Sequence, residues 1–150
     1  MSLLKFLNTD IVMREVPNEV SLAFNITNCT HKCKGCHTPE LRKDIGTELN
    51  DTVLINHIKR NEAGISCVLF LGGKYEEVIK LIKSVSSKFP KIQWAWYTGD
   101  NTFNKTDLIL DYVKIGEYIE ELGPINKVGS NQKLYKRYGY EYKNITYMMR

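Results

Sequence analysis

Four cysteines in 150 residues are few, and three of them fall within residues 29–36. Cysteines this sparse exclude the dense disulfide framework that holds small secreted domains together. The sequence also has no run of about 18 or more apolar residues, so we expect no membrane-spanning helix. Its first residues, MSLLKFLNTD, lack the basic and apolar regions of a secretory signal. We therefore expect a cytoplasmic protein, in a compartment that keeps thiols reduced.

Net charge is low as well. The sequence has 21 Lys and Arg against 17 Asp and Glu, which leaves a formal charge of +4. This excess is too small to predict nucleic-acid binding. Internal repeats, low-complexity tracts and linkers are also missing, and a chain of this length can bury a core of its own. We expect a single domain over residues 1–150, with neither nucleic acid nor membrane as a partner.

Hydrophobic periodicity predicts an α/β fold. The predicted strands are residues 19–26, 66–71, 91–99 and 111–116, and the predicted helices are residues 50–61 and 74–89. The stretch from Leu3 to Val16 can pair with the first strand as a hairpin. Strands that alternate with helices are typical of βα units, which form a parallel sheet with right-handed crossovers.

Small residues follow the predicted strands. Gly72 and Gly73 follow the second strand, Thr98 and Gly99 end the third, and Gly116 ends the fourth. The first strand runs toward the cysteines. Because chemistry in parallel sheets and barrels is found at the carboxyl ends of the strands, we expect these residues and the cysteine loop to share one rim.

The cysteine loop, CTHKCKGCH, places three cysteines and two histidines in nine positions. Cys29, Cys33 and Cys36 have the spacing C-x3-C-x2-C. Structural zinc takes four ligands, usually in two separated pairs. The second pair is missing here, although His31 or His37 could complete a zinc site locally.

Two other interpretations of the loop compete with zinc. Disulfide chemistry ranks third, because the compartment is reducing and HTPE rather than a helix signal follows the C-x2-C pair. Three thiolates suit a [4Fe–4S] cluster that keeps one iron open, since such a cluster normally takes four thiolates. Cys67 lies in an apolar strand, so we expect it to pack rather than to act as the fourth ligand.

These motifs resemble the radical S-adenosylmethionine (SAM) superfamily, in which C-x3-C-x2-C follows a first strand and glycines follow the second. The sequence is similar, more specifically, to the anaerobic ribonucleoside-triphosphate reductase activating proteins. The segments that carry this resemblance are CTHKCKGCH, AWYTG and VGSNQKLY, and it extends from about Leu7 to about Tyr135. It implies a partial (β/α) barrel of the radical SAM type with a mainly parallel sheet, since a closed barrel takes about 250 residues.

The resemblance implies that Cys29, Cys33 and Cys36 hold a [4Fe–4S] cluster whose open iron binds SAM. The expected activity is that of a radical SAM oxidoreductase, which cleaves SAM reductively to methionine and a 5′-deoxyadenosyl radical. This radical would generate a glycyl radical on the large subunit of an anaerobic ribonucleoside-triphosphate reductase. An electron donor such as flavodoxin is expected as a second partner. The alternatives are an activase of another glycyl-radical enzyme and a non-catalytic zinc-binding interaction module.

The resemblance also implies SAM contacts. They are His37, next to the adenine, the backbone of Gly72 and Gly73, at the methionyl amino group, and Thr98 with Gly99, at the end of the third strand. An ordinary loop histidine accounts for the first equally well, and a simple strand-to-loop turn accounts for the last two almost as well.

Two lysines need separate interpretations. Lys74 stands where an acidic residue commonly follows the two glycines of the family, so the sequence departs from the family there. Lys114 lies in an otherwise apolar strand, so it either faces the rim and an anion or lies on an edge. We favour the edge, because lysine is common on edge strands. Trp94 and Trp96 alternate on the third strand, and we expect both in the core.

Overall fold

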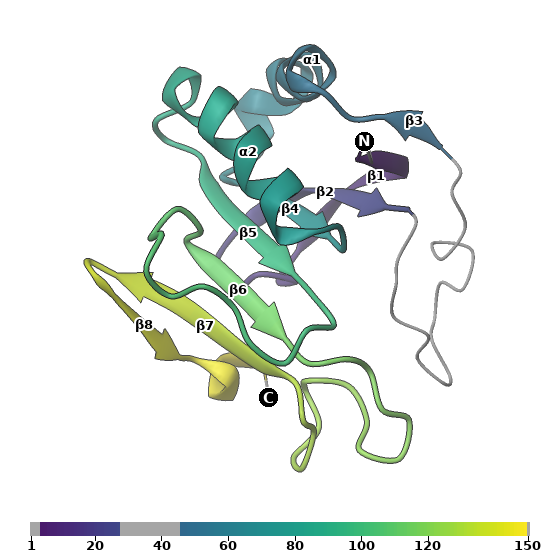
Figure 1. Ribbon diagram of the computed structural model, residues 1–150, viewed down its shortest axis with the longest axis vertical. Coiled ribbons are helices and arrows are strands. Elements are labelled where there is room, and N and C mark those ends of the chain that lie inside the picture. The colour runs from purple at the N-terminus through teal and green to yellow at the C-terminus, as the bar shows by residue number, and fades with distance from the viewer. Residues whose placement is uncertain (1–3, 28–45, 150) are drawn as a thin grey trace.

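The computed structural model of the protein describes residues 4–27 and 46–149, which form one eight-stranded sheet and two α-helices (Figure 1). The strand order is β3-β1-β2-β4-β5-β6-β7-β8. The strands are β1 (Lys5–Met13), β2 (Val20–Ile26), β3 (Thr47–Glu48), β4 (Cys67–Leu71), β5 (Gln93–Tyr97), β6 (Tyr112–Ile115), β7 (Lys133–Tyr138) and β8 (Glu141–Asn144). The helices are α1 (Asp51–Asn61) and α2 (Tyr75–Val85), with 3-10 turns η2 (Glu62–Gly64), η3 (Ser86–Lys88) and η4 (Thr146–Met149).

The centre of the sheet is parallel, as the sequence predicts. β2, β4, β5 and β6 lie side by side in parallel register, and all four coincide with predicted strands. The predicted hairpin is also confirmed, because β1 pairs antiparallel with β2.

The flanks of the sheet depart from the prediction of a mainly parallel partial barrel. β1 and β3 on one side, and β7 and β8 on the other, are antiparallel, and the described sheet is open. The crossover from β5 to β6 contains no helix. It instead uses local turns, in which Asn104 Oδ1 accepts the Thr106 N–H (2.8 Å) and Leu108 has a φ of +56°. The observed fold is therefore a mixed α/β sheet.

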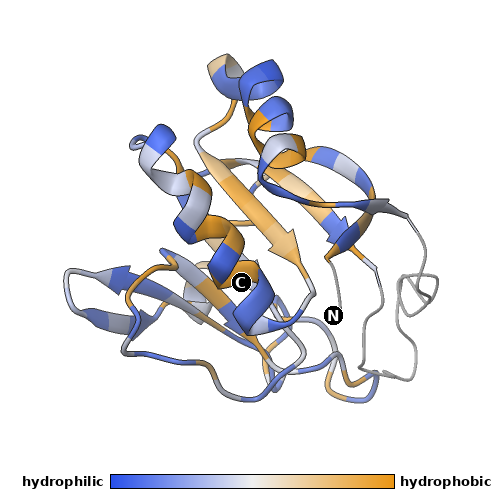
Figure 2. Cartoon of the chain, turned by 45° about the horizontal axis from the view of Figure 1, so that its top comes forward, coloured by the Kyte–Doolittle hydropathy of each residue, from blue (hydrophilic) through white to orange (hydrophobic). Residues whose placement is uncertain are grey.

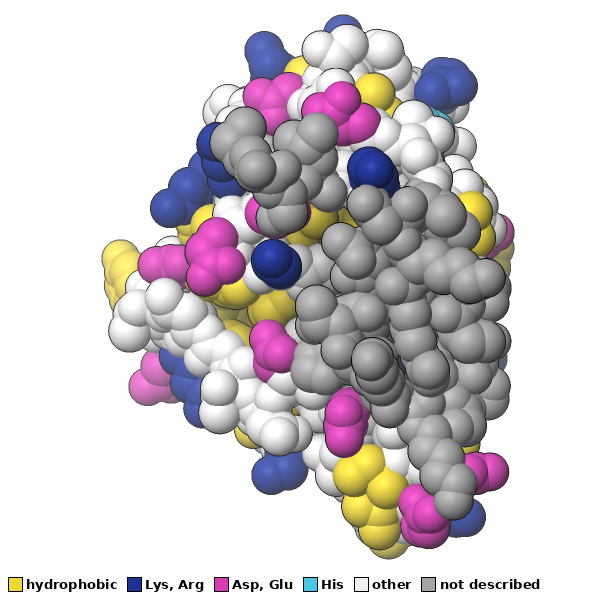
Figure 3. Space-filling view, turned by 45° about the vertical axis from the view of Figure 1, so that its right-hand side comes forward, with side chains coloured by type: hydrophobic (Ala, Val, Ile, Leu, Met, Phe, Trp, Pro, Cys, Tyr) yellow, Lys and Arg dark blue, Asp and Glu magenta, His cyan; other side chains and the backbone are white. Residues whose placement is uncertain are grey.

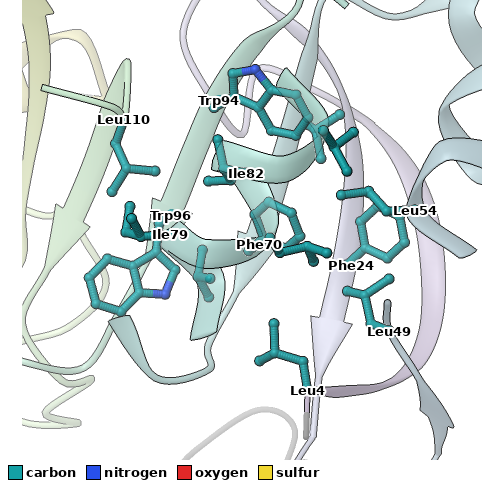
Figure 4. Close-up of a cluster of buried hydrophobic side chains, with 14 of the residues drawn as sticks. Leu4, Phe24, Leu49, Leu54, Phe70, Ile79, Ile82, Trp94, Trp96 and Leu110 are labelled. Carbon is teal, nitrogen blue, oxygen red and sulfur yellow. The ribbon is translucent and has the colours of Figure 1, made fainter. Parts of the chain in front are cut away.

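Both helices cover the same face of the sheet, which we call the helix face (Figure 2). Asn50 caps α1, because its side chain accepts the Val53 N–H at 3.0 Å, and Leu54 and Ile58 are buried on the sheet side. The cap and the apolar spacing account for the helix predicted over residues 50–61. α2 buries a longer apolar stripe, and Figure 4 shows Ile79 and Ile82 from it among the sheet's aromatic residues.

Aromatic side chains form a row across the helix face. The ring centroids of Phe24 and Phe70 lie 5.7 Å apart, and those of Phe70 and Trp94 lie 6.4 Å apart, in stacked arrangements (Figure 4). Trp94 and Trp96 are both buried, which confirms that they belong to the core. These large rings on adjacent parallel strands pack against one another in the core between the sheet and the helices.

The opposite face carries smaller side chains. Ala23, Leu69 and Ala95 lie on neighbouring strands there, and the buried Val16, from the turn between β1 and β2, covers them. Cys67 belongs to the same cluster and is fully buried, so it packs as predicted. No α-helix of the described residues lies on this face (Figure 1).

None of the described helices is both long and apolar enough to cross a bilayer. The cytoplasmic location stays a prediction.

Candidate functional site

The parallel strands end together at one rim of the sheet, on the side where the chain leaves β2 for the cysteine loop (Figure 1). The chain reaches this rim at Thr27, whose N–H donates to the Lys5 carbonyl at 2.9 Å. Cys29 follows two residues later. Cys29, Cys33, Cys36 and His37 lie outside the described residues, so their assignment stays a prediction.

Gly72 and Gly73 form the turn after β4, and both have positive φ, +100° and +90°. A Cβ at Gly73 would lie 3.1 Å from Leu4 Cδ2 and 3.2 Å from Val78 Cγ2, so only glycine fits without strain. Gly72 uses its own backbone within the fold: its N–H donates to the Tyr97 carbonyl and its carbonyl accepts the Trp96 indole N–H, both at 2.9 Å.

Gly73 is therefore the better candidate of the two for a backbone contact with a ligand. Among the residues that the structure describes, none makes a hydrogen bond to its N–H or C=O. Lys74, which begins α2, is exposed and makes no side-chain cap. The turn thus presents backbone at the rim and directs the lysine to solvent.

Thr98 and Gly99 lie at the same rim, at the end of β5. Thr98 donates its N–H to the Lys114 carbonyl (2.8 Å), and its Oγ1 accepts the Asp100 N–H (3.1 Å). Because these groups already hold the turn, the structure favours a turn-forming role for Thr98. Gly99 is half-buried beside it.

The GSNQ segment joins the rim, which the sequence alone did not predict. Gly116 has a φ of +97°, and its carbonyl accepts the Gln132 side-chain amide at 3.3 Å. Asn131 donates to the Glu117 carbonyl at 3.1 Å, while its own Oδ1 is buried and has no hydrogen-bond partner in the part of the chain that the structure describes. The Gly116 N–H donates to the Asp100 carbonyl at 2.7 Å. Backbone and amide hydrogen bonds thus connect the turns after β4, β5 and β6 into one continuous rim.

Lys114 is not an edge residue, and the sequence interpretation was wrong. β6 lies between β5 and β7, so Lys114 is in the interior of the sheet. Its ammonium lies 4.5 Å from the centroid of the Tyr97 ring on the opposite face. Burial lowers the pKa of Lys114, and the charge of Glu15 opposes this. The Tyr97 hydroxyl donates to the Glu15 carbonyl and anchors the ring.

A second polar group lies on the same face beside β2. Asn25 donates from its side-chain amide to Asn8 Oδ1 (2.9 Å) and to Asp10 Oδ2 (3.2 Å). Asn25, the next-to-last residue of β2, precedes Cys29 by four positions. The carboxyl end of the opposite face therefore carries a carboxylate near β1 and an ammonium on β6. Figure 3 shows acidic and basic side chains interspersed on the side of the molecule it presents.

No cluster of three or more metal-binding side chains occurs within residues 4–27 and 46–149. Cys67 begins β4 and pairs with Ser21, so it lies at the end of the strand away from the rim. Burial is the main cause that raises the pKa of its thiol to about 12. His57 packs its ring against Phe6 and Phe24, and burial lowers its pKa. Cys67 therefore lies at the far end of β4 from the rim, where the chain enters the cysteine loop.

Comparison with known proteins adds the deciding observation. Residues 19–135 match the family of 4Fe-4S single cluster domains. The chain belongs to this family. The match begins one residue before β2, spans the cysteine loop and ends within β7, so it includes every element that forms the rim. The interpretation of the loop as an iron–sulfur ligand set agrees with this membership, whereas zinc does not.

Other comparisons of this iron–sulfur family member contribute less. A trichothecene O-acetyltransferase of Trichoderma arundinaceum is 39% identical over 79 residues, which are 51% of this chain and 14% of that protein. Because the chain spans about a seventh of its length, we assign no acetyl transfer to the chain. No solved structure matches.

Proposed function

We propose that the chain is a radical SAM activating enzyme, which generates a glycyl radical on the large subunit of an anaerobic ribonucleoside-triphosphate reductase. In this proposal Cys29, Cys33 and Cys36 hold a [4Fe–4S] cluster, and SAM binds at its remaining iron. When bound, the cluster supplies the electron that cleaves SAM into methionine and the 5′-deoxyadenosyl radical. An electron donor such as flavodoxin would restore that electron.

The observation that carries the proposal is the burial of Cys67, the cysteine outside the loop. The family match supports a single [4Fe–4S] cluster, which normally needs four thiolates. Cys67, the fourth cysteine, is buried at the far end of β4 and cannot reach the rim. Three thiolates from one loop leave one iron for a small-molecule ligand.

The described residues of the rim offer one backbone position for a polar ligand. The N–H and carbonyl of Gly73 make no hydrogen bond within residues 4–27 and 46–149, so the carbonyl can accept a hydrogen bond from the amino group of SAM. His37 and Gly99 remain proposed contacts from the family resemblance.

The open sheet supports a macromolecular substrate. We propose that the fold is a reduced relative of the partial barrel, with antiparallel strands where further βα units would stand. An enzyme for a small substrate closes its site against water, whereas a glycine within a large protein needs a wide entrance. The open edges of the described sheet, and an opposite face that no α-helix of residues 4–27 and 46–149 covers, are consistent with such an entrance.

The test starts with anaerobic purification of the full chain and of two variants, Cys33→Ala and Cys67→Ala. We expect iron and sulfide in the wild type and in Cys67→Ala, together with cleavage of SAM to methionine and 5′-deoxyadenosine under reductant. Cys33→Ala should lose both. Bound zinc without sulfide, or loss of the cluster in Cys67→Ala, would contradict the proposed ligand set.

The reductase assignment has its own readout. With the anaerobic reductase of the same organism, SAM and reductant, electron paramagnetic resonance should show a glycyl radical on the reductase. If SAM is cleaved but no radical forms on that reductase, while another glycyl-radical enzyme becomes activated, the chain is an activase of the second enzyme.

A further inference from the structure

The excess positive charge of the chain lies in its last segment, which contains β7, β8 and η4. Residues 133–150 include five lysines and arginines and one glutamate, a net charge of +4 that equals the formal charge of the whole chain. The 132 residues before them carry 16 basic and 16 acidic side chains, which balance. The same segment holds five of the nine tyrosines. Positive charge and aromatic rings are therefore concentrated on one hairpin at the end of the sheet (Figure 1).

Two of these lysines face each other across the hairpin. Lys136 on β7 pairs with Lys143 on β8, so their side chains leave the same face of the sheet from directly opposite positions. Both ammonium groups lie over the ring of Tyr138, at 5.2 and 5.4 Å from its centroid. Lys136 also lies 5.4 Å from the centroid of the Tyr112 ring. Aromatic rings attract cations, so Tyr138 holds two like charges close together.

Neither of the two ammonium groups forms an ion pair within the described residues. The neighbouring Arg137 differs, since its guanidinium pairs with Asp111 at 2.8 Å. Glu141, the acidic residue of the hairpin, also makes no ion pair with a described residue. Like charges directly opposite on antiparallel strands destabilise a sheet, so the lysine pair costs folding free energy in the isolated chain. A partner that supplies carboxylates would offset this cost.

Tyrosines extend the same surface around the hairpin turn. Tyr138 is 45% exposed and Tyr140 is 89% exposed, on either side of Gly139. Tyrosine is enriched in protein interfaces, where its ring adds contact area and its hydroxyl adds a hydrogen bond. We call Lys136, Tyr138, Tyr140 and Lys143 the hairpin patch. It combines two cations with two large exposed or partly exposed rings.

We propose that the hairpin patch binds an acidic segment of a partner protein. The ammonium pair would bind carboxylates of the segment, and the two tyrosine rings would pack against the side chains between them. Binding of single-stranded nucleic acid uses free ring faces for base stacking and a basic groove along the backbone. Two ammonium groups lie over the Tyr138 ring, and the rest of the chain has no net charge, so an acidic protein fits better.

The hairpin patch lies away from the rim. Lys136 pairs with Tyr112, the first residue of β6, whereas the rim is at the last residues of the parallel strands. A partner bound to the patch would therefore leave the approach to the cysteine loop open. The inference does not depend on the proposed SAM chemistry, and each can fail without the other.

Fluorescence anisotropy of a labelled oligoglutamate peptide, titrated with the full chain, tests the inference. We expect binding that weakens as salt is added, because ions screen exposed charges. The double variant Lys136→Gln/Lys143→Gln should raise the Kd by about tenfold, through the loss of two exposed ion pairs. Lys80→Gln/Lys83→Gln is the matched control. It removes the same charge from exposed side chains of α2 and should bind like the wild type.

Stability separates a binding role of the lysine pair from a structural one. Lys143→Gln removes the repulsion across the hairpin, so this variant should be at least as stable as the wild type in chemical denaturation while it binds the peptide more weakly. A labelled oligothymidylate is the nucleic-acid comparison and should bind more weakly than oligoglutamate. The proposal is overturned if the wild type does not bind oligoglutamate, if both double variants lose binding equally, if oligothymidylate binds more tightly, or if Lys143→Gln loses stability without losing affinity.

Discussion

The two ends of the parallel strands are built differently. At the amino ends, Glu19 accepts hydrogen bonds from the Ser66 hydroxyl (2.7 Å) and the Tyr112 hydroxyl (3.0 Å), and thus connects β2, β4 and β6. At the carboxyl ends, glycines with positive φ form the turns, and backbone groups connect them. Side-chain hydrogen bonds thus connect the strands at their amino ends, whereas the turns at their carboxyl ends are formed by backbone groups.

This difference separates stability from chemistry within one sheet. The amino ends bury Ser21, Cys67 and Tyr112, and Ser21 Oγ has no hydrogen-bond partner in the described part of the chain. The carboxyl ends leave the Gly73 backbone and Asn131 Oδ1 without partners in the same residues. Because the chain enters the cysteine loop at the carboxyl ends, the groups without partners at the rim are the ones that a ligand is expected to bind.

Of the changes considered, Gly73→Ala should have the largest effect on stability, because it alters the turn after β4 at the rim. The new Cβ would contact Leu4 and Val78 at about the limit of tolerance, in a backbone conformation that favours glycine. We expect a loss of about 2 to 3 kcal/mol in the free energy of unfolding, measured by chemical denaturation. Gly64→Ala is the control, since a Cβ there meets no atom within 4 Å. Equal stability of the two variants would show that the rim turn is not constrained.

Tyr112→Phe alters the amino end and should have a smaller effect. The substitution removes one hydrogen bond to the Glu19 carboxylate without changing the ring, at a cost of about 1 kcal/mol in unfolding free energy. Iron content should not change, because the cysteine loop follows the other end of β2. Tyr140→Phe, at an 89% exposed side chain, should leave the unfolding free energy unchanged. A loss of iron in Tyr112→Phe would contradict the separation of the two ends.

The smallest effect is expected for alkylation of the Cys67 thiol in the folded protein. Since its thiol pKa is raised from 9.0 to about 12, the thiolate is scarce at pH 8 and at pH 9, so alkylation of Cys67 in the folded protein should be slow at either pH. The neutral thiol is favoured by folding, so its contribution to stability is complete below pH 9 and is lost as the pH rises toward 12. Peptide mass spectrometry after iodoacetamide treatment should find Cys67 modified only when denaturant is present. Modification under native conditions would show that the strand opens locally.

Local signals predicted the helices and the central strands. The signals for α1, the Asn50 cap and the apolar spacing of Leu54 and Ile58, all lie close together in the sequence. Gly72, which has a positive φ, marks the turn that ends β4. The β7–β8 hairpin escaped prediction because charged residues and tyrosines, rather than aliphatic residues, alternate along it. The Gly139 turn, with a φ of +64°, was the signal that could have revealed the hairpin.

The failure to predict β7 also affected the interpretation of Lys114. Without β7, β6 looked like the last strand of the sheet, so Lys114 was interpreted as an edge residue. The pairing of Lys114 with Leu134 joins segments 20 residues apart, and no local pattern encodes it. The GSNQ segment was recognised as a motif, but its contact with Gly116 depends on that same pairing. The position of Lys114 and the contact of the GSNQ segment with Gly116 could not be predicted, because both depend on pairing between distant segments.

The hydrogen bond from the Trp96 indole to the Gly72 carbonyl couples an optical chromophore to the turn before α2. Indole emission responds to the polarity and hydrogen bonding at its nitrogen, and Trp94, the other tryptophan, is also buried in the helix face. Any displacement of this turn would thus alter the protein's intrinsic fluorescence, so the cluster-free chain carries a native, label-free reporter of rim geometry.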